Sequence, residues 1–291
     1  MKFSVSSYSY WRYIDSGEKT LEECIQLAKD SGFDGIEFVD FTLKTDKPLA
    51  EYAAFLRAEC ERIGIEAVAY TIGADFLNGC DGDLEKEIER IKGQVDIADI
   101  LGVKLMRHDA TGGYKKEDRG FKGFDDALPR IVEGTKAVTE YAKQFGIKTT
   151  TENHGYFSQD SVRVEKIVNT VADDNFGLLI DIGNFMCADE NPVEAVGRLA
   201  PYAFHVHAKD FHKKSGNAPF FCDGFFKTRG GTYLRGAIIG HGDVPVYQCL
   251  STLVANGYDG YVTVEFEGME DPVTGTIYGL NTLKRMCESI C

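Results

Sequence analysis

Eight short β-rich runs alternate with longer helical patterns along almost the whole of this 291-residue chain. The clearest helical pattern covers residues 84–101, where apolar side chains recur at helical spacing. Repeated strand–helix units of this kind predict a parallel sheet, because each helix returns the chain to the starting edge before the next strand. The predicted strands are 3–7, 35–39, 65–71, 103–108, 147–153, 176–181, 203–208 and 261–266.

Two parallel architectures fit this pattern, a closed barrel and an open doubly wound sheet. Polar candidates end the predicted strands four to eight, whereas an open sheet would gather them at one switch point. No G-x-G-x-x-G motif follows the first strand and no G-x-x-x-x-G-K-[ST] motif occurs, which disfavours dinucleotide-binding and P-loop folds. We therefore predict an α/β fold, a single-domain (β/α)8 TIM barrel over residues 1–291.

Four strand ends supply a ligand set for one metal ion: Glu152 in TTTEN, Asp181 in LLIDIGN, His207 in FHVHAKD and Glu265 in VTVEFEG. In a closed parallel barrel such ends converge on one mouth. Strand alternation places Asp181, His207 and Glu265 opposite apolar rows, and carboxylates inside a barrel need a partner because isolated buried charges are costly. Carboxylates with one imidazole suit Mn²⁺ or Mg²⁺, with Co²⁺ or Zn²⁺ as alternatives. The sequence predicts one divalent ion.

The segment 211–243 departs from the repeating pattern. It follows the seventh strand, where a helix is expected, and it is instead rich in glycine and aromatic residues. Loops of this length are usually functional or disordered. Its five phenylalanines and one tyrosine argue against disorder, so we predict a long ordered loop that covers the mouth and selects the substrate.

Composition excludes several classes of protein. The formal net charge of -14 opposes binding to a nucleic-acid backbone, and no run approaches the length of a membrane-spanning helix. The first residues lack a long apolar run, so we expect no secretory signal and a cytoplasmic protein. Eight cysteines without a C-x-x-C pair indicate neither a zinc ribbon nor a disulfide framework.

The motifs TENHG, DIGN, VHAKD, GHGD and VEFEG occur in this order along the chain. In this respect the chain resembles the xylose-isomerase-like sugar phosphate isomerase/epimerase superfamily, the TIM barrels that include the AP endonuclease family 2 fold. The resemblance implies that Glu152, Asp181, His207 and Glu265 are the metal ligands. By analogy with the ketose 3-epimerases of that superfamily, Glu152 and Glu265 would also form the acid–base pair.

Several further residues are candidates for contact with a carbohydrate substrate. Lys209, Arg235 and His241 fall where the resembling family often has such groups. Without a glycine-rich phosphate cradle after strands seven and eight, we expect an unphosphorylated substrate at least as readily as a phosphorylated one.

Four other candidates come from their places along the chain. His108 ends the fourth strand and either orients a substrate hydroxyl or Glu152 or is structural, whereas His154 should point toward the mouth. Glu37 either bonds a substrate hydroxyl or pairs with a nearby lysine or arginine. Trp11 either stacks on a sugar face or packs the lid.

The leading functional hypothesis is a metal-dependent isomerase or epimerase of a polyhydroxylated carbonyl compound, acting through an enediolate. A lyase is the alternative, either like inosose dehydratase or eliminating from a keto-glycoside, because it shares the first proton abstraction. A non-enzymatic carbohydrate-binding subunit and a nuclease are further alternatives. Asn184 stands where the family's nucleases carry a histidine, and only Asp210 and His212 are available for the second metal of an aldose isomerase. The resemblance also suggests a homodimer or tetramer.

Overall fold

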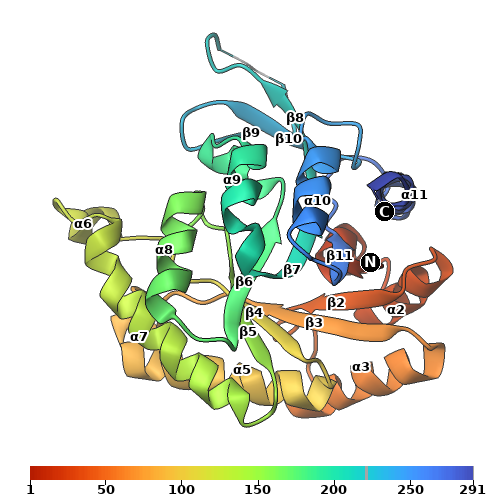
Figure 1. Ribbon diagram of the computed structural model, residues 1–291. Coiled ribbons are helices and arrows are strands. Elements are labelled where there is room, and N and C mark those ends of the chain that lie inside the picture. Colours follow the sequence, from red (N-terminus) through yellow and green to blue (C-terminus); the bar gives the residue numbers. More distant parts are fainter. Residues whose placement is uncertain (220–221, 291) are drawn as a thin grey trace.

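The chain forms a closed eight-stranded parallel barrel in a computed structural model that describes residues 1–219 and 222–290 (Figure 1). Around the barrel the strands follow the order β1-β11-β7-β6-β5-β4-β3-β2. All eight predicted strands are confirmed, with ends that differ by at most two residues. The strands are β1 Lys2–Ser6, β2 Gly35–Val39, β3 Glu66–Ile72, β4 Leu105–His108, β5 Lys148–Glu152, β6 Phe176–Asp181, β7 Ala203–Ala208 and β11 Tyr261–Val264.

Helices surround the strands and cover their apolar outer face (Figure 1). α2 begins at a capping box in which Thr20 and Glu23 satisfy each other's backbone N–H groups. α3 and α5 end at Gly64 and Gly102, whose positive φ angles of 75° and 86° suit glycine. The main helices are α2 Leu21–Asp30, α3 Leu49–Ile63, α5 Leu84–Leu101, α7 Phe124–Lys143, α8 Ser161–Val171, α9 Pro192–Leu199, α10 Val246–Ala255 and α11 Pro272–Ile290.

Shorter elements occupy the connections. They are η1 Ser7–Tyr10, α1 Trp11–Ser16, α4 Gly79–Gly82, α6 Lys116–Arg119, η2 Asn184–Ala188 and η3 Ala200–Tyr202. Among the helices of the described ranges, none combines the length and apolarity that a membrane span requires.

The pleat of the strands separates an apolar layer from a polar interior. Val262 and Val264 are fully buried in the hydrophobic core, whereas Thr263 between them bonds Ser4 of the neighbouring strand β1 at 2.6 Å inside the barrel. Because successive side chains alternate between the two faces, the polar residues of each strand line the barrel. This arrangement brings the strand-end residues to one mouth.

The segment after β7 is ordered where the structure describes it, and it contains three strands. β8 Asp210–Lys214, β10 Tyr233–Ala237 and β9 Phe226–Lys227 form an antiparallel sheet in the order β8-β10-β9, which projects beyond the barrel (Figure 1). Phe220 and Phe221, which contributed to the prediction of order, lie outside the described residues.

This segment rests on the loops after β5 and β6, where Arg229 bonds Asp160 at 2.9 Å and Thr228 bonds Asp189 at 2.7 Å. The segment also contacts the loop after β11, where Gly236 forms a bridge with Gly268. None of its described residues lines the cavity at the mouth of the barrel. β8 continues almost directly from β7, and the role of this segment as a cover of the mouth stays a prediction.

Candidate metal centre

The four predicted ligands converge at the mouth of the barrel. Ligand atoms of Glu152, Asp181, His207 and Glu265 all lie within 4.8 Å of one another. Asp181 and His207 are paired residues of neighbouring strands, and the backbone N–H of Glu265 donates to Ala208 at 3.0 Å. The first three side chains are buried, and that of Glu265 is 11% exposed. Four strand ends thus form one compact, negatively charged cluster.

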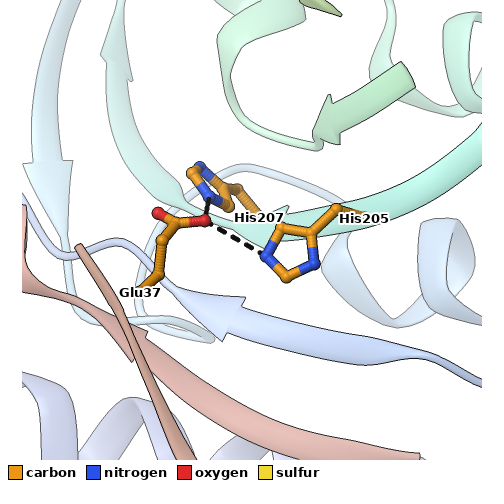
Figure 2. A group of neighbouring side chains, drawn as sticks. All are labelled: Glu37, His205 and His207. Atoms are coloured by element: carbon orange, nitrogen blue, oxygen red, sulfur yellow. Dashed lines mark hydrogen bonds and ion pairs between the residues drawn. The ribbon is translucent and has the colours of Figure 1, made fainter. Parts of the chain in front are cut away.

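The imidazole of His207 is held from behind by a buried carboxylate. Its Nε2 lies 2.9 Å from Glu37 Oε2, and His205 Nε2 lies 3.2 Å from the same oxygen (Figure 2). The predicted alternative of a lysine or arginine partner for Glu37 is wrong, because β2 faces β7 through the interior. Burial alone would raise the pKa of Glu37, but His207 and His205 lower it to about 2. An ionised Glu37 therefore fixes the orientation of His207.

Two buried polar atoms that face the cluster form no hydrogen bond, namely Asp181 Oδ2, which has only an ion pair with Lys209 at 3.3 Å, and His207 Nδ1. A proton on His207 Nε2 leaves the Nδ1 lone pair 3.6 Å from Glu265 Oε2 and 3.9 Å from Asp181 Oδ2. Protonation of the imidazole, or a cation bound between the three groups, would satisfy the Nδ1 atom. In agreement, the pKa of His207 is raised well above its usual value, because the carboxylates outweigh burial. The donor set fits a divalent metal ion.

Lys209 already supplies one positive charge to the cluster. Its buried ammonium lies 2.5 Å from Glu265 Oε2, 3.0 Å from Glu267 Oε1 and 3.3 Å from Asp181 Oδ2. Nevertheless the pKa of Asp181 is raised to about 7, chiefly by burial and also by Glu265 and Glu152, against the lowering effect of Lys209. One ammonium therefore does not neutralise the cluster, and a further cation would stabilise ionised Asp181.

Arg107 is a site residue that the sequence analysis missed. Its Nη2 lies 2.5 Å from Glu152 Oε2 and 2.8 Å from Asp109 Oδ1, and the side chain is buried. Asn184 Nδ2 donates to the other oxygen of Glu152 at 2.9 Å. Both oxygens of Glu152 are therefore positioned by the protein. Strand alternation in LMRH was the available signal, because Arg107 lies on the face opposite Met106.

The same alternation places the side chain of His108 on the outer face of β4, away from the mouth. Its ring packs between Phe76 and Phe176, with centroid distances of 5.6 Å and 6.2 Å. Burial among these rings lowers the pKa of His108 to about 4, so it is neutral. The predicted substrate contact of His108 is therefore wrong, because the residue faces the helices.

A cavity of about 260 Å³ opens above the cluster. Lys209 and His154 line it, and His154 Nδ1 lies 3.1 Å from Asp109 Oδ1. Burial would lower the pKa of His154, but the bond to Asp109 raises it. The cavity is lined by Tyr8, Val39, Thr71, Arg107, Glu152, His154, His207, Lys209, Glu265 and Glu267.

The other predicted substrate contacts lie elsewhere. Arg235 is on β10, with its guanidinium 5.5 Å from the centre of the Phe225 ring, and exposed His241 lies in the turn after that strand. Neither of them lines the mouth cavity. Both belong to the extension that follows β7, and their contact with a substrate stays a prediction. Trp11 lines a neighbouring cavity.

We expect the Glu37→Gln substitution to weaken divalent-metal binding by about tenfold or more. Carboxylates behind ligating histidines typically contribute this much, since they fix the ring and raise its basicity. Calorimetric titration of the metal-free protein with MnCl₂ measures the effect, and Glu61→Gln on the exposed face of α3 is the matched control. Equal affinities for the two variants would show that Glu37 has no part in metal binding.

Comparisons with known proteins agree with this architecture. The sequence model of the family described as xylose isomerase-like TIM barrel matches residues 25–286. A curated relative, an inosose dehydratase of Mesomycoplasma hyopneumoniae, is 24% identical over 271 residues, covering 88% of this chain and 83% of that protein.

Solved structures with low sequence identity share the fold. A protein called IOLI, with a bound zinc atom, aligns at 21% identity and a TM-score of 0.73, over 100% of this chain and 98% of that chain. The 3-keto-D-glucoside 4-epimerase YcjR of E. coli, in its apo form, aligns at 16% identity and a TM-score of 0.68. That alignment covers 91% of this chain and 94% of the epimerase.

Proposed function

The chain belongs to the xylose isomerase-like TIM barrel family, and from this premise we propose a metal-dependent enzyme that acts on a polyhydroxylated, sugar-like carbonyl compound. Its first step is removal of a proton beside the carbonyl group. The observation that supports this most directly is the buried cluster of Glu152, Asp181, His207 and Glu265 under a cavity at the mouth. The curated relatives named inosose dehydratase support a sugar-like substrate.

The four cluster residues would hold one divalent ion, for which the oxygen-rich donor set favours Mn²⁺ or Mg²⁺ and also admits Zn²⁺. When bound, such an ion polarises the substrate carbonyl and so acidifies the neighbouring C–H bond. Glu265 would take or return the proton on one side of the substrate, and Glu152 would act on the other. Lys209 and Arg107 keep these two carboxylates in place through the contacts described above.

Return of the proton gives an isomerase or epimerase, which is the function that two opposed carboxylates support best. Dehydration is the second candidate, because it shares the first step and is the reaction named for the curated relatives. The pair of His154 and Asp109 favours it as well. His154 lines the same cavity as Glu152, and Asp109 contacts His154 from outside the cavity lining. A protonated His154 could transfer its proton to a departing hydroxide.

We expect the metal-loaded protein to exchange a carbon-bound proton of its substrate with solvent. Incubation in D₂O with ketoses, inososes and keto-glycosides, followed by mass spectrometry, tests this directly. A product with substrate mass plus one deuterium identifies an isomerase or epimerase, whereas loss of one water identifies a dehydratase.

The metal-free protein is the control for this exchange. Absence of bound metal by elemental analysis, together with absence of exchange for every compound, would contradict the proposal and favour a carbohydrate-binding subunit.

A further inference from the structure

A second cavity adjoins the mouth, between the loops that follow β1 and β2. It has a volume of about 370 Å³, and we call it the aromatic cavity. Its walls include the apolar side chains Tyr8, Trp11, Ile14, Leu21 and Val39. Tyr8 and Trp11 lie three residues apart on consecutive helical turns and are 38% and 41% exposed. Neighbouring exposed aromatic rings are typical of a binding surface rather than of a closed core.

The aromatic cavity is the neighbour of the mouth cavity. Tyr8 and Val39 line both cavities. Charged residues of the mouth also act on the Tyr8 hydroxyl. Burial, and then the negative charges of Glu267 and Glu265, raise the pKa of Tyr8 to about 12. A molecule bound over the metal cluster would therefore meet the ring of Tyr8 first and that of Trp11 beyond it.

The wall that carries Trp11 is held firmly against the mouth. Arg12 Nη1 donates to the carbonyl of Met269 at 2.9 Å, and its Nη2 donates to the carbonyl of Glu270. The hydroxyl of Tyr13 donates to Asp271. These bonds tie α1 to the segment after β11 that also carries Glu265. The aromatic wall and the catalytic carboxylate thus keep a defined relative position.

The charged residues of the aromatic cavity already have partners, and together they leave one negative charge, that of Asp40. Lys44 forms an ion pair with Asp15, and Asp40 accepts hydrogen bonds from the backbone and hydroxyl of Thr42. What the cavity offers a ligand is therefore mainly its apolar wall and two aromatic faces. This chemistry suits an uncharged, flat ring better than a phosphate or a second polyol.

We propose that the aromatic cavity binds an apolar ring attached to the substrate, so that the enzyme acts on a glycoside-like compound and not on a free sugar or cyclitol. The inference rests on the proposed function, because the polyhydroxylated part must occupy the mouth. The ring lies against Trp11 and Tyr8 while the carbonyl part lies over Glu152 and Glu265.

Trp11 is the single tryptophan of the chain, so its fluorescence reports on this cavity alone. We expect phenyl β-D-glucoside to bind the Mg²⁺-loaded protein about tenfold more tightly than methyl β-D-glucoside, as aromatic burial of this kind typically yields. The phenyl compound should shift the Trp11 emission, whereas the methyl compound should not. Equal affinities, or tighter phenyl binding without an emission change, would overturn the proposal.

Variants provide a second test by calorimetry. Trp11→Ala should abolish the preference for the phenyl compound, Trp11→Phe should retain most of it, and Tyr278→Ala at an exposed position of α11 should leave it unchanged. A preference that survives in Trp11→Ala contradicts the proposal. A change in oligomeric mass of Trp11→Ala by light scattering would also contradict it, since the cavity would then belong to an interface between copies.

Failure of this inference is distinguishable from failure of the proposed function. If small ketoses exchange a proton but the phenyl compound shows no preference, the aromatic cavity is not a substrate site and the proposed function still holds. If the phenyl compound binds preferentially but no tested compound exchanges a proton, binding in the aromatic cavity is supported and the proposed reaction is contradicted.

Discussion

Glu265→Gln is expected to lower turnover by about 10³-fold or more while the barrel remains folded. Glutamine keeps the shape of the side chain but accepts no proton, and general acid–base catalysis by a positioned group typically contributes about 10²–10⁴-fold. The carboxylate also neutralises Lys209 and faces His207. The same loss is expected for Glu152→Gln, because in the proposed mechanism the two carboxylates act on the same substrate carbon.

Turnover is measured with the compound that shows deuterium exchange, and folding by circular dichroism during thermal unfolding. Elemental analysis at saturating metal separates loss of the ion from loss of the proton acceptor. Glu61→Gln, an exposed carboxylate on α3, should retain full activity. Near-normal turnover of either active-site variant would exclude the proposed proton transfer.

Arg107→Met is expected to destabilise the folded protein by about 3–5 kcal/mol, the typical cost of removing one partner of a buried ion pair. Methionine fills much of the space of arginine but leaves Glu152 and Asp109 without their shared cation. Burial would raise the pKa of Asp109, whereas Arg107 lowers it in the native protein. Urea unfolding followed by fluorescence measures the loss of stability.

The pH dependence of this loss has a defined sign. A carboxyl whose folded pKa is lowered stabilises the protein above its unfolded value of about 3.9, and this stability disappears as the pH falls through the folded pKa. The difference between the native protein and Arg107→Met should therefore be largest near neutral pH and shrink below about pH 4. Arg57→Met, which removes an exposed ion pair with Glu61, is the control and should cost less than about 1 kcal/mol. An equally small effect at Arg107 would contradict its role.

The barrel and its cluster of acidic strand ends were predictable from local features of the chain. Successive side chains of VTVEF point to opposite faces of the strand, which places Glu265 on the interior face. This alternation is a property of the backbone and does not depend on neighbouring strands. Parallel strands then bring Asp181 and Glu265 to the same mouth. His108 was misplaced because its position at a strand end was considered without the alternation that puts Arg107 inside and His108 outside.

Contacts between distant parts of the chain were decided only by the tertiary structure. Glu37 and His207 are 170 residues apart, and only closure of the barrel brings β2 opposite β7 so that this carboxylate holds that imidazole. In the same way, the bonds of Arg12 to the segment after β11 hold α1, which carries Trp11, beside the mouth. The position of the hairpin at 210–237 depends on packing against the loops after β5 and β6.

By itself, the sequence determined which residues face the interior and at which end of each strand they lie, because these properties depend on backbone periodicity. Which of those side chains pair with one another, and which cavities they leave, depends on distances across the closed barrel. These distances arise from packing of the whole chain, and no local pattern contains them.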